Sequence, residues 1–335
     1  MGQDGVSRPR SRGLTVRKRP LIVLSTVAAA TLLLAGCAGS AAPESSGTPA
    51  PSASSACALD AQPGETSDAV VVEGEGADTK VTVPADAAFA GVERTVISEG
   101  DGEDLVVNDL VSVQYQIVDA TTNEVVDSSA RGEGGVLPVL LDPNQSSLFV
   151  AALECEPAGS RILLALPGNV LGEGANSVVV YAEAVEKLPE VATGTPVEST
   201  PGMPTVKLDD KGAPTVTIPD GDAPTATEVA VLKQGDGATV ASGDLVVVQY
   251  LGVKWSDGKE FDSSWSRDAA PAQFQTTGVV AGFQKALEGQ KVGSQVVVVM
   301  PPADGYGASE GHELQKESLV FVVDILATTP VQPQQ

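Results

Sequence analysis

The chain has 335 residues, enough for two modest domains with terminal extensions. It is strongly acidic, with 44 acidic and 20 basic residues and a formal charge of −24. Phosphate binding requires clustered Lys and Arg, and no basic cluster follows the first twenty residues, so the composition argues against nucleic acid as a partner. Of the twelve aromatic residues, eight lie between Tyr250 and Phe321. This uneven placement predicts that the second half of the chain needs an aromatic surface.

Residues 1–36 are predicted to be a signal peptide. Six Arg and Lys residues precede residue 20, and residues 21–36 form an apolar run that is short for a membrane span. Leu34-Ala35-Gly36-Cys37 resembles a bacterial lipobox, in which the Cys is lipidated and becomes the first mature residue. The alternative is an ordinary signal peptide followed by a chance Cys. The lipobox predicts an extracytoplasmic protein that a lipid on Cys37 anchors to the cell membrane.

Three segments are predicted to lie outside the folded domains. Residues 38–56 are mostly Ala, Ser, Pro and Gly, so residues 37–56 are expected to be the anchor Cys and a flexible tether. Residues 189–208 have a similar composition and are predicted to be a linker, and residues 328–335 a tail. The remaining segments, 57–188 and 209–327, are the two expected domains.

The two domains share an internal repeat. Asp127-Ser128-Ser129 recurs as Asp262-Ser263-Ser264, and the strand around Tyr115 recurs around Tyr250, both at an offset of 135 residues. In the second copy, alternating apolar residues predict strands, and residues 281–287 have helical spacing with Gly289 as the stop signal. Each copy is therefore predicted to be an α+β domain, a twisted antiparallel sheet wrapped around one short helix.

The second copy resembles the FKBP family of peptidyl-prolyl cis/trans isomerases. The matching segments cover roughly residues 228–326 in the order of the family: Gln249-Tyr250, residues 257–264 (DGKEFDSS), residues 279–283 (VVAGF), Leu287-Glu288-Gly289, Tyr306-Gly307 and Leu319-Val320-Phe321. The resemblance implies two tandem FKBP-like domains, of which the first is degenerate.

The resemblance also implies the active site. Asp262 and Tyr306 are the expected catalytic polar groups, and the expected substrate-binding residues are Tyr250, Phe261, Phe274, Val279, Val280, Phe283 and Phe321. There are departures from the family pattern. Phe283 stands where Trp is common in the family, and Ala272 stands where the family has an aromatic residue in the pocket wall. The loop after Tyr306 differs from the family pattern, so His312 is left outside the site.

The chemistry of X–Pro isomerisation suits these residues. Amide resonance opposes rotation by roughly 18–20 kcal/mol, and an aromatic pocket disfavours the polar planar form relative to the twisted one. The Tyr306 hydroxyl and the Val280 N–H can hold the peptide carbonyls. No nucleophile, metal ion or cofactor is required, and the sequence contains no pattern typical of one.

The first copy keeps the predicted pattern of strands and helix but loses most of the pocket residues. Tyr115, Asp127 and Phe149 remain. The other pocket positions change: Phe261 becomes Val126, Phe321 becomes Val180, Tyr306 most nearly matches Leu171, and Val279-Val280 falls at Gln145 and Ser146. The first copy is therefore expected to be structural or to hold peptides without isomerising them.

Two cysteines remain after Cys37. Cys57 precedes the first domain and Cys155 lies within it, an even pair in an oxidising exterior. We expect a disulfide between them, and two free thiols are the alternative.

The predicted function is peptidyl-prolyl isomerase and folding helper for exported proteins, with the active site in the second domain. Its expected partners are X–Pro-containing exported polypeptides, macrolide ligands by family resemblance, and the membrane through the lipid anchor. The alternative is a non-catalytic surface-binding or holdase module in which both domains only grip polypeptides.

Overall fold

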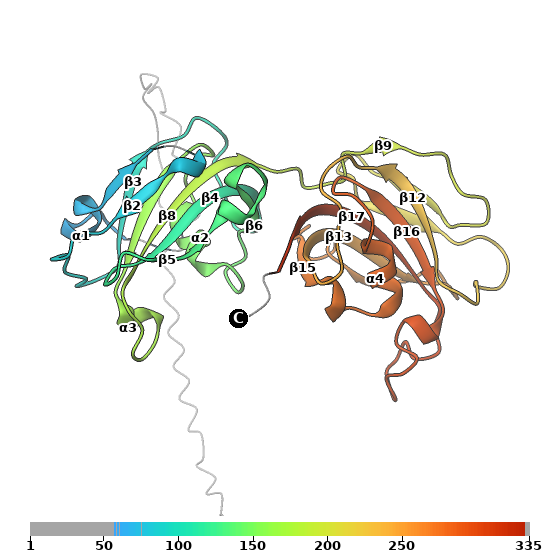
Figure 1. The fold of residues 1–335 in the computed structure, drawn as a ribbon. Helices are drawn as coiled ribbons and strands as arrows, with labels where there is room; N and C mark the ends of the chain where they lie inside the picture. The colour runs from blue at the N-terminus through green and yellow to red at the C-terminus, as the bar shows by residue number, and fades with distance from the viewer. Residues whose placement is uncertain (1–56, 58, 60, 75, 332–335) are drawn as a thin grey trace, which may run out of the picture. The chain divides into compact units, whose positions relative to one another are not determined.

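The computed structural model describes residues 57, 59, 61–74 and 76–331. The predicted signal peptide, Cys37 and the tether thus lie outside the described residues. The described part contains two large antiparallel sheets, each with one short helix packed on one face (Figure 1). This arrangement confirms the α+β class. No helix in this part of the chain is long and apolar enough to cross a membrane.

The first sheet has the strand order β3-β7-β8-β4-β5, and β6 also pairs with β4. Its helix is α2 (Ser147–Leu153), which contacts β7 and β8. The strands of this sheet are β3 (Glu93–Ser98), β4 (Leu110–Asp119), β5 (Val125–Ser128), β6 (Leu137–Leu140), β7 (Arg161–Leu166) and β8 (Val178–Lys187).

The second sheet repeats this order as β12-β16-β17-β13-β14, with β15 also paired to β13. A further strand, β9 (Thr195–Pro196), extends it beyond β12. Its helix is α4 (Ala281–Leu287), which ends just before Gly289, where φ is +83°. The strands are β12 (Glu228–Gln234), β13 (Leu245–Lys254), β14 (Glu260–Ser263), β15 (Ala272–Gln275), β16 (Gln295–Met300) and β17 (Leu319–Thr329). Strand β17 thus includes the first two residues of the predicted tail.

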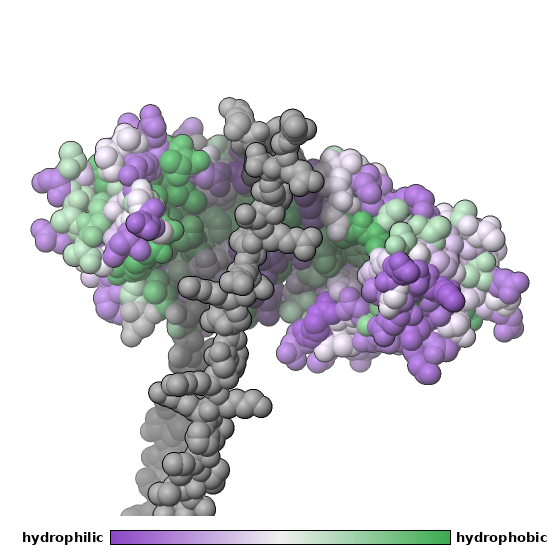
Figure 2. Space-filling view, turned by 90° about the horizontal axis from the view of Figure 1, so that it is seen from below, coloured by the Kyte–Doolittle hydropathy of each residue, from purple (hydrophilic) through white to green (hydrophobic). Residues whose placement is uncertain are grey.

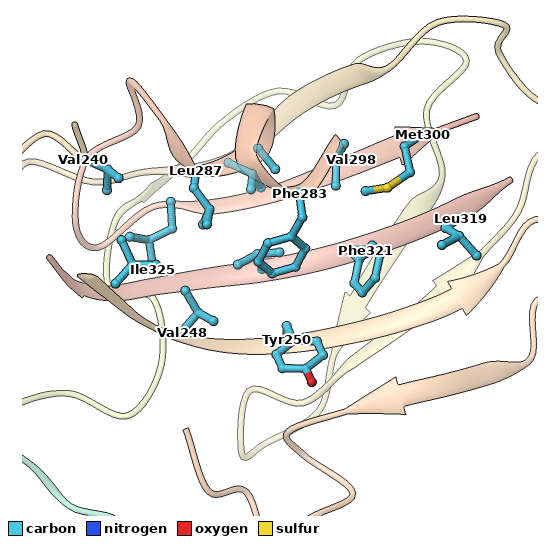
Figure 3. Close-up of a cluster of buried hydrophobic side chains, with 14 of the residues drawn as sticks. Val240, Val248, Tyr250, Phe283, Leu287, Val298, Met300, Leu319, Phe321 and Ile325 are labelled. Carbon is cyan, nitrogen blue, oxygen red and sulfur yellow. The ribbon is translucent and has the colours of Figure 1, made fainter. Parts of the chain in front are cut away.

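The period-two pattern of β13 explains how this domain forms two cores. Val246, Val248 and Tyr250 point to the face that α4 covers, where they pack with Phe283 and Phe321 (Figure 3). Leu251 and Val253 pack in a separate cluster with Val216 and Ile218, on and just after the hairpin β10–β11. The second sheet is therefore buried on both faces.

Each domain has such a hairpin, which the sequence analysis did not predict. Hairpin β10 (Thr205–Leu208) and β11 (Pro214–Thr217) corresponds to β1 (Val71–Glu73) and β2 (Lys80–Thr82) of the first domain. In the first domain, residues on and beside this hairpin cluster with Leu163 and Tyr181. The smaller elements are helices α1 (Glu65–Ala69) and α3 (Gly168–Leu171) and 3₁₀ turns η1 (Gly76–Asp78), η2 (Ser129–Arg131), η3 (Glu133–Gly135), η4 (Thr276–Gly278) and η5 (Pro302–Asp304).

The segment 189–208, predicted from its composition to be a linker, is largely part of the second domain. The N–H of Leu188 bonds to the first domain at Leu110, and the next segment bonds to the second domain from Ala192 onward. The buried Asp324 carboxylate accepts the Ala192 N–H at 2.8 Å, and Lys233 Nζ donates to the Ala192 carbonyl at 2.9 Å. We call residues 192–197 the strap. Buried polar partners and the pairing of β9 with β12 hold it in place.

The structure joins Cys57 to Cys155, with a Cα–Cα distance of 6.0 Å and a sequence separation of 98. Cys155 lies just beyond the end of α2, so the bond attaches the leading segment of the chain beside that helix.

Candidate active site

Aromatic side chains from four strands and one helix converge in the second domain. Phe321 lies at the centre, with its ring centroid 5.1 Å from Phe283, 5.4 Å from Phe261 and 6.2 Å from Tyr250. Most of these pairs are edge-to-face, the favourable geometry for aromatic rings. The structure brings every predicted pocket residue to this cluster. Tyr250, Phe283 and Phe321 are buried there, and five partly buried residues pack against them: Phe261, Phe274, Val279, Val280 and Tyr306.

A polar network borders the aromatic cluster. The Tyr250 hydroxyl donates to Asp262 Oδ2 at 2.6 Å, and Arg267 Nη2 donates to the Tyr250 hydroxyl at 2.8 Å. Arg267 also pairs directly with Asp262, which closes a three-membered ring of contacts. Burial, followed by the hydrogen bond to Asp262, raises the pKa of Tyr250 to about 12. Tyr250 therefore stays protonated and fixes the direction of the Asp262 carboxylate.

Two donors at this site have no acceptor. The Tyr306 hydroxyl and the Val280 N–H make no hydrogen bond within the part of the chain that the structure describes. Burial, and then the negative charge of Asp262, raise the pKa of Tyr306, so its hydroxyl remains a donor. Both groups can bind carbonyl oxygens of a polypeptide that enters the pocket.

His312, which sequence reasoning left outside the site, lies against Tyr306. The two rings stack with centroids 4.2 Å apart and an interplanar angle of 5°. The Leu314 N–H donates to His312 Nδ1 at 3.1 Å, and Leu314 itself is buried in the aromatic core. The loop that follows Tyr306 thus packs against one side of the aromatic cluster. Only the spacing of Tyr306 and His312 in one loop could have indicated this contact.

Gly252 is a second residue that sequence reasoning missed. A Cβ atom at this position would lie 2.7 Å from Phe321 Cε1 and 2.8 Å from Phe261 Cζ. Both rings can therefore occupy these positions only because residue 252 has no side chain. The first domain has Ile117 at the corresponding register, opposite Val180 as Gly252 is opposite Phe321. The second domain thus has both the aromatic walls and the glycine, and the first domain has neither.

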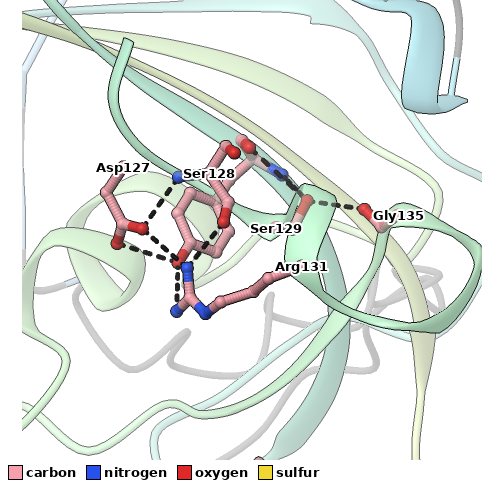
Figure 4. A network of polar contacts seen from close by, with 6 residues as sticks. Asp127, Ser128, Ser129, Arg131 and Gly135 are labelled. Carbon is pink, nitrogen blue, oxygen red and sulfur yellow. Dashed lines mark hydrogen bonds and ion pairs between the residues drawn. The ribbon is translucent and has the colours of Figure 1, made fainter. Parts of the chain in front are cut away.

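The first domain retains the polar network without the aromatic walls (Figure 4). The Tyr115 hydroxyl donates to Asp127 at 3.0 Å, and Arg131 bonds to both, at 3.0 Å to Tyr115 and 2.6 Å to Asp127. Burial, and then the charge of Asp127, raise the pKa of Tyr115 to about 12. The centroid of the Tyr115 ring lies 4.8 Å from that of Phe149. At the positions of Phe261 and Phe321, Val126 is exposed and Val180 is buried.

Comparisons with known proteins agree with the geometry of the second domain. The family described as "FKBP-type peptidyl-prolyl cis-trans isomerase" matches residues 237–326. A probable FK506-binding protein from Corynebacterium glutamicum is 40% identical over 94 residues, which cover 28% of this chain and 79% of that protein. An FK506-binding protein from Streptomyces anulatus is 38% identical over 99 residues, with the same coverage of both chains.

Among solved structures, FkpA from Escherichia coli matches at 30% identity and a TM-score of 0.30, covering 39% of this chain and 53% of that one. The matched residues 237–326 contain Tyr250, Asp262, Tyr306 and the aromatic cluster. The chain belongs to the FKBP-type peptidyl-prolyl cis-trans isomerase family, through its second domain.

Proposed function

We propose that the second domain isomerises X–Pro peptide bonds of polypeptides. The observation that carries this proposal is the aromatic cluster of Phe261, Phe283 and Phe321, beside which the Tyr306 hydroxyl and the Val280 N–H have no hydrogen-bond acceptor among the described residues. A planar X–Pro amide is polar, and water stabilises it by hydrogen bonding to its oxygen. An aromatic enclosure removes that water and therefore disfavours the planar form more than the twisted transition state.

The Asp262 carboxylate adds to this preference. In the planar amide the carbonyl oxygen carries more negative charge than in the twisted amide, because rotation breaks the resonance. A fixed carboxylate beside the pocket repels the planar form more strongly than the twisted form, and Tyr250 and Arg267 hold it in place. Tyr306 and Val280 meanwhile hold the polypeptide by its carbonyl groups. The route uses no covalent intermediate and no cofactor.

We further propose that the two sheets are tandem copies of one FKBP-like domain. The shared strand order supports this, as does a shared contact beneath the site. The Tyr250 N–H donates to Ser264 Oγ at 2.8 Å, and the Tyr115 N–H donates to Ser129 Oγ at 2.9 Å. Only the second copy has the enclosure that the proposed mechanism needs.

The two aspartates provide a matched test within the full chain. We expect Asp262→Ala to lower kcat/KM on an X–Pro peptide by about tenfold, the effect of one positioned electrostatic contact worth about 1.4 kcal/mol. Asp127→Ala removes the same network in the first domain and should leave isomerase activity unaltered. Equal losses in the two variants, or no loss in either, would contradict the assignment of the active site.

We propose that the substrates are exported polypeptides and that the protein acts at the outer face of the cell membrane. The basic and apolar segments of residues 1–36 and the lipobox at Cys37 support this location. Two relatives are named for binding FK506, and we propose that the same aromatic pocket accepts such a macrolide.

The anchor can be tested by fractionation. We expect the wild-type protein to partition with membranes, because a lipid on Cys37 supplies the large apolar surface that residues 38–56, the segment after the cleavage point, lack. Cys37→Ala should yield soluble or unprocessed protein. Recovery of the wild-type protein entirely as soluble material without lipid, as judged by mass spectrometry, would rule out the anchor.

A further inference from the structure

Both domains bury a carboxylate directly before their longest shared strand. Asp109 precedes β4 and Asp244 precedes β13, and the two residues are only 4% and 5% exposed. The Val106 N–H donates to Asp109 Oδ2, and the Ala241 N–H donates to Asp244 Oδ2, both at 2.9 Å. The same turn thus brings a carboxylate to the same buried place in each copy.

Among the described residues, only the first copy provides a cation for this carboxylate. Lys187 Nζ lies 2.8 Å from Asp109 Oδ1. Thr328 occupies the strand position of Lys187 in the second copy, and its hydroxyl donates to Asp244 Oδ2 at 2.9 Å. Within the described chain, Asp244 Oδ1 has no hydrogen-bond donor and no Lys or Arg partner. One oxygen of a buried carboxylate is therefore left for a partner from outside.

Asp244 lines a cavity between the two domains. The described parts of both domains belong to one compact unit, and an apolar cluster joins their sheets, formed by Leu110, Leu140, Val247, Leu326 and Ala327. The cavity beside this cluster has a volume of about 430 Å³, which suits a small-molecule ligand. Much of its wall is apolar, including Leu137, Pro138, Leu188, Val292, Ile325 and Leu326.

Few charges reach this wall. Its charged residues in the described chain are Asp244, Arg131 and Glu133, and Arg131 is already paired with Asp127. A mostly apolar cavity with one buried carboxylate fits a ligand that is apolar along most of its length and positive at one end.

We propose that this cavity binds an apolar ligand with one protonated amine, whose ammonium group pairs with Asp244. Burial removes water from a carboxylate, and only a cation or hydrogen bonds offset that cost. Asp109 has its cation within its own domain, in Lys187. At Asp244 an external ammonium takes the position that Lys187 Nζ has in the first copy, and the alkyl chain packs against the apolar wall.

Isothermal titration calorimetry of the full, oxidised chain with octylammonium tests this proposal. Octanol and octanoate share the alkyl chain of the probe but carry no charge or a negative one. We expect octylammonium to bind the wild-type protein at least tenfold more tightly than either of them. Asp244→Asn should weaken octylammonium binding at least tenfold, the effect of one hydrogen bond between charged groups, and should leave octanol binding unchanged.

A second variant copies the arrangement of the first domain. Thr328→Lys keeps Asp244 and places an ammonium at the strand position of Lys187. The new side chain should pair with Asp244, so we expect octylammonium to bind this variant at least tenfold more weakly than wild type. If Asp244→Asn does not fold, this variant decides the question, and unchanged binding in it overturns the proposal.

Controls separate this site from weak binding elsewhere. The chain is strongly acidic, and Figure 2 shows apolar residues gathered on the surface of the first domain, where an alkyl chain has no contact with Asp244. Glu228→Gln removes an exposed acid of β12 that does not line the cavity, and it should leave binding as in wild type.

The proposal is overturned if octylammonium binds the wild-type protein no more tightly than octanol, or if folded Asp244→Asn and Glu228→Gln bind it alike. Isomerase activity on an X–Pro peptide should be the same in all of these proteins. A failure of this proposal is therefore distinguishable from a failure of the isomerase assignment in the second domain.

Discussion

Gly252→Ile should abolish most isomerase activity while the second domain remains folded. The new side chain would enter the space of Phe261 and Phe321, whose nearest atoms lie 2.8 and 2.7 Å from the position of a Cβ. Overpacking of this kind costs about 1–3 kcal/mol and displaces the rings that enclose the substrate. We expect kcat/KM on an X–Pro peptide to fall by about a hundredfold, because both walls are lost together.

The matched control is Ile117→Gly in the first domain. It removes the side chain that fills the corresponding space, but Val126 and Val180 cannot form aromatic walls there. We expect this variant to destabilise the first domain and to gain no isomerase activity. A Gly252→Ile protein with native circular dichroism and wild-type turnover would show that enclosure by these rings is not needed.

Asp324→Ala should strongly destabilise the second domain by releasing the strap. The substitution leaves the Ala192 N–H and the Gln295 amide, which donates to Asp324 at 2.6 Å, without their buried acceptor. Each such group costs about 1–3 kcal/mol, so we expect the free energy of unfolding to fall by about 2–6 kcal/mol. Urea unfolding followed by tryptophan fluorescence measures this domain alone, because both Trp residues of the chain, Trp255 and Trp265, pack in its outer core.

Asp324→Asn separates the hydrogen bonds from the charge. Burial raises the pKa of Asp324 above its unfolded value, so between the two values the folded state binds more protons than the unfolded state. The contribution of this group to stability is therefore largest in acid and is lost as the pH rises through the raised pKa. The Asn variant keeps one of the two oxygen acceptors, so we expect it to lose less stability than Asp324→Ala at neutral pH, with a weaker dependence on pH than wild type.

A matched control for the strap is Glu183→Ala. Glu183 occupies the equivalent place on β8, opposite Gln114 as Asp324 is opposite Gln249 on the second sheet, but it bonds to the Tyr181 hydroxyl and not to a strap. This variant should leave the tryptophan transition unchanged. If Asp324→Ala unfolds at the same urea concentration as wild type, the strap does not stabilise the second domain.

The sequence by itself determined the features that depend on neighbours along the chain. Alternation in residues 246–250 set which side chains face the helix, Gly289 ended that helix, and the repeated Asp-Ser-Ser segments predicted a second copy with a similar polar site. Each of these follows from local geometry, in which the position of a residue in a strand or helix decides the direction of its side chain.

Tertiary structure decided the features that depend on partners far away in sequence. The strap has the composition of a flexible linker. Its order comes from Asp324 and Lys233, which lie 132 and 41 residues from Ala192, and from the pairing of β9 with β12. Gly252 is needed because Phe321, brought beside it by strand pairing, occupies its side-chain space. Leu59 is one apolar residue in a segment without periodicity, and it packs against a buried cluster of Leu164, Leu166 and Val180, which lie much later in the chain. Propensity and spacing carry no information about such contacts, because burial and hydrogen bonding are properties of the assembled fold and not of the segment.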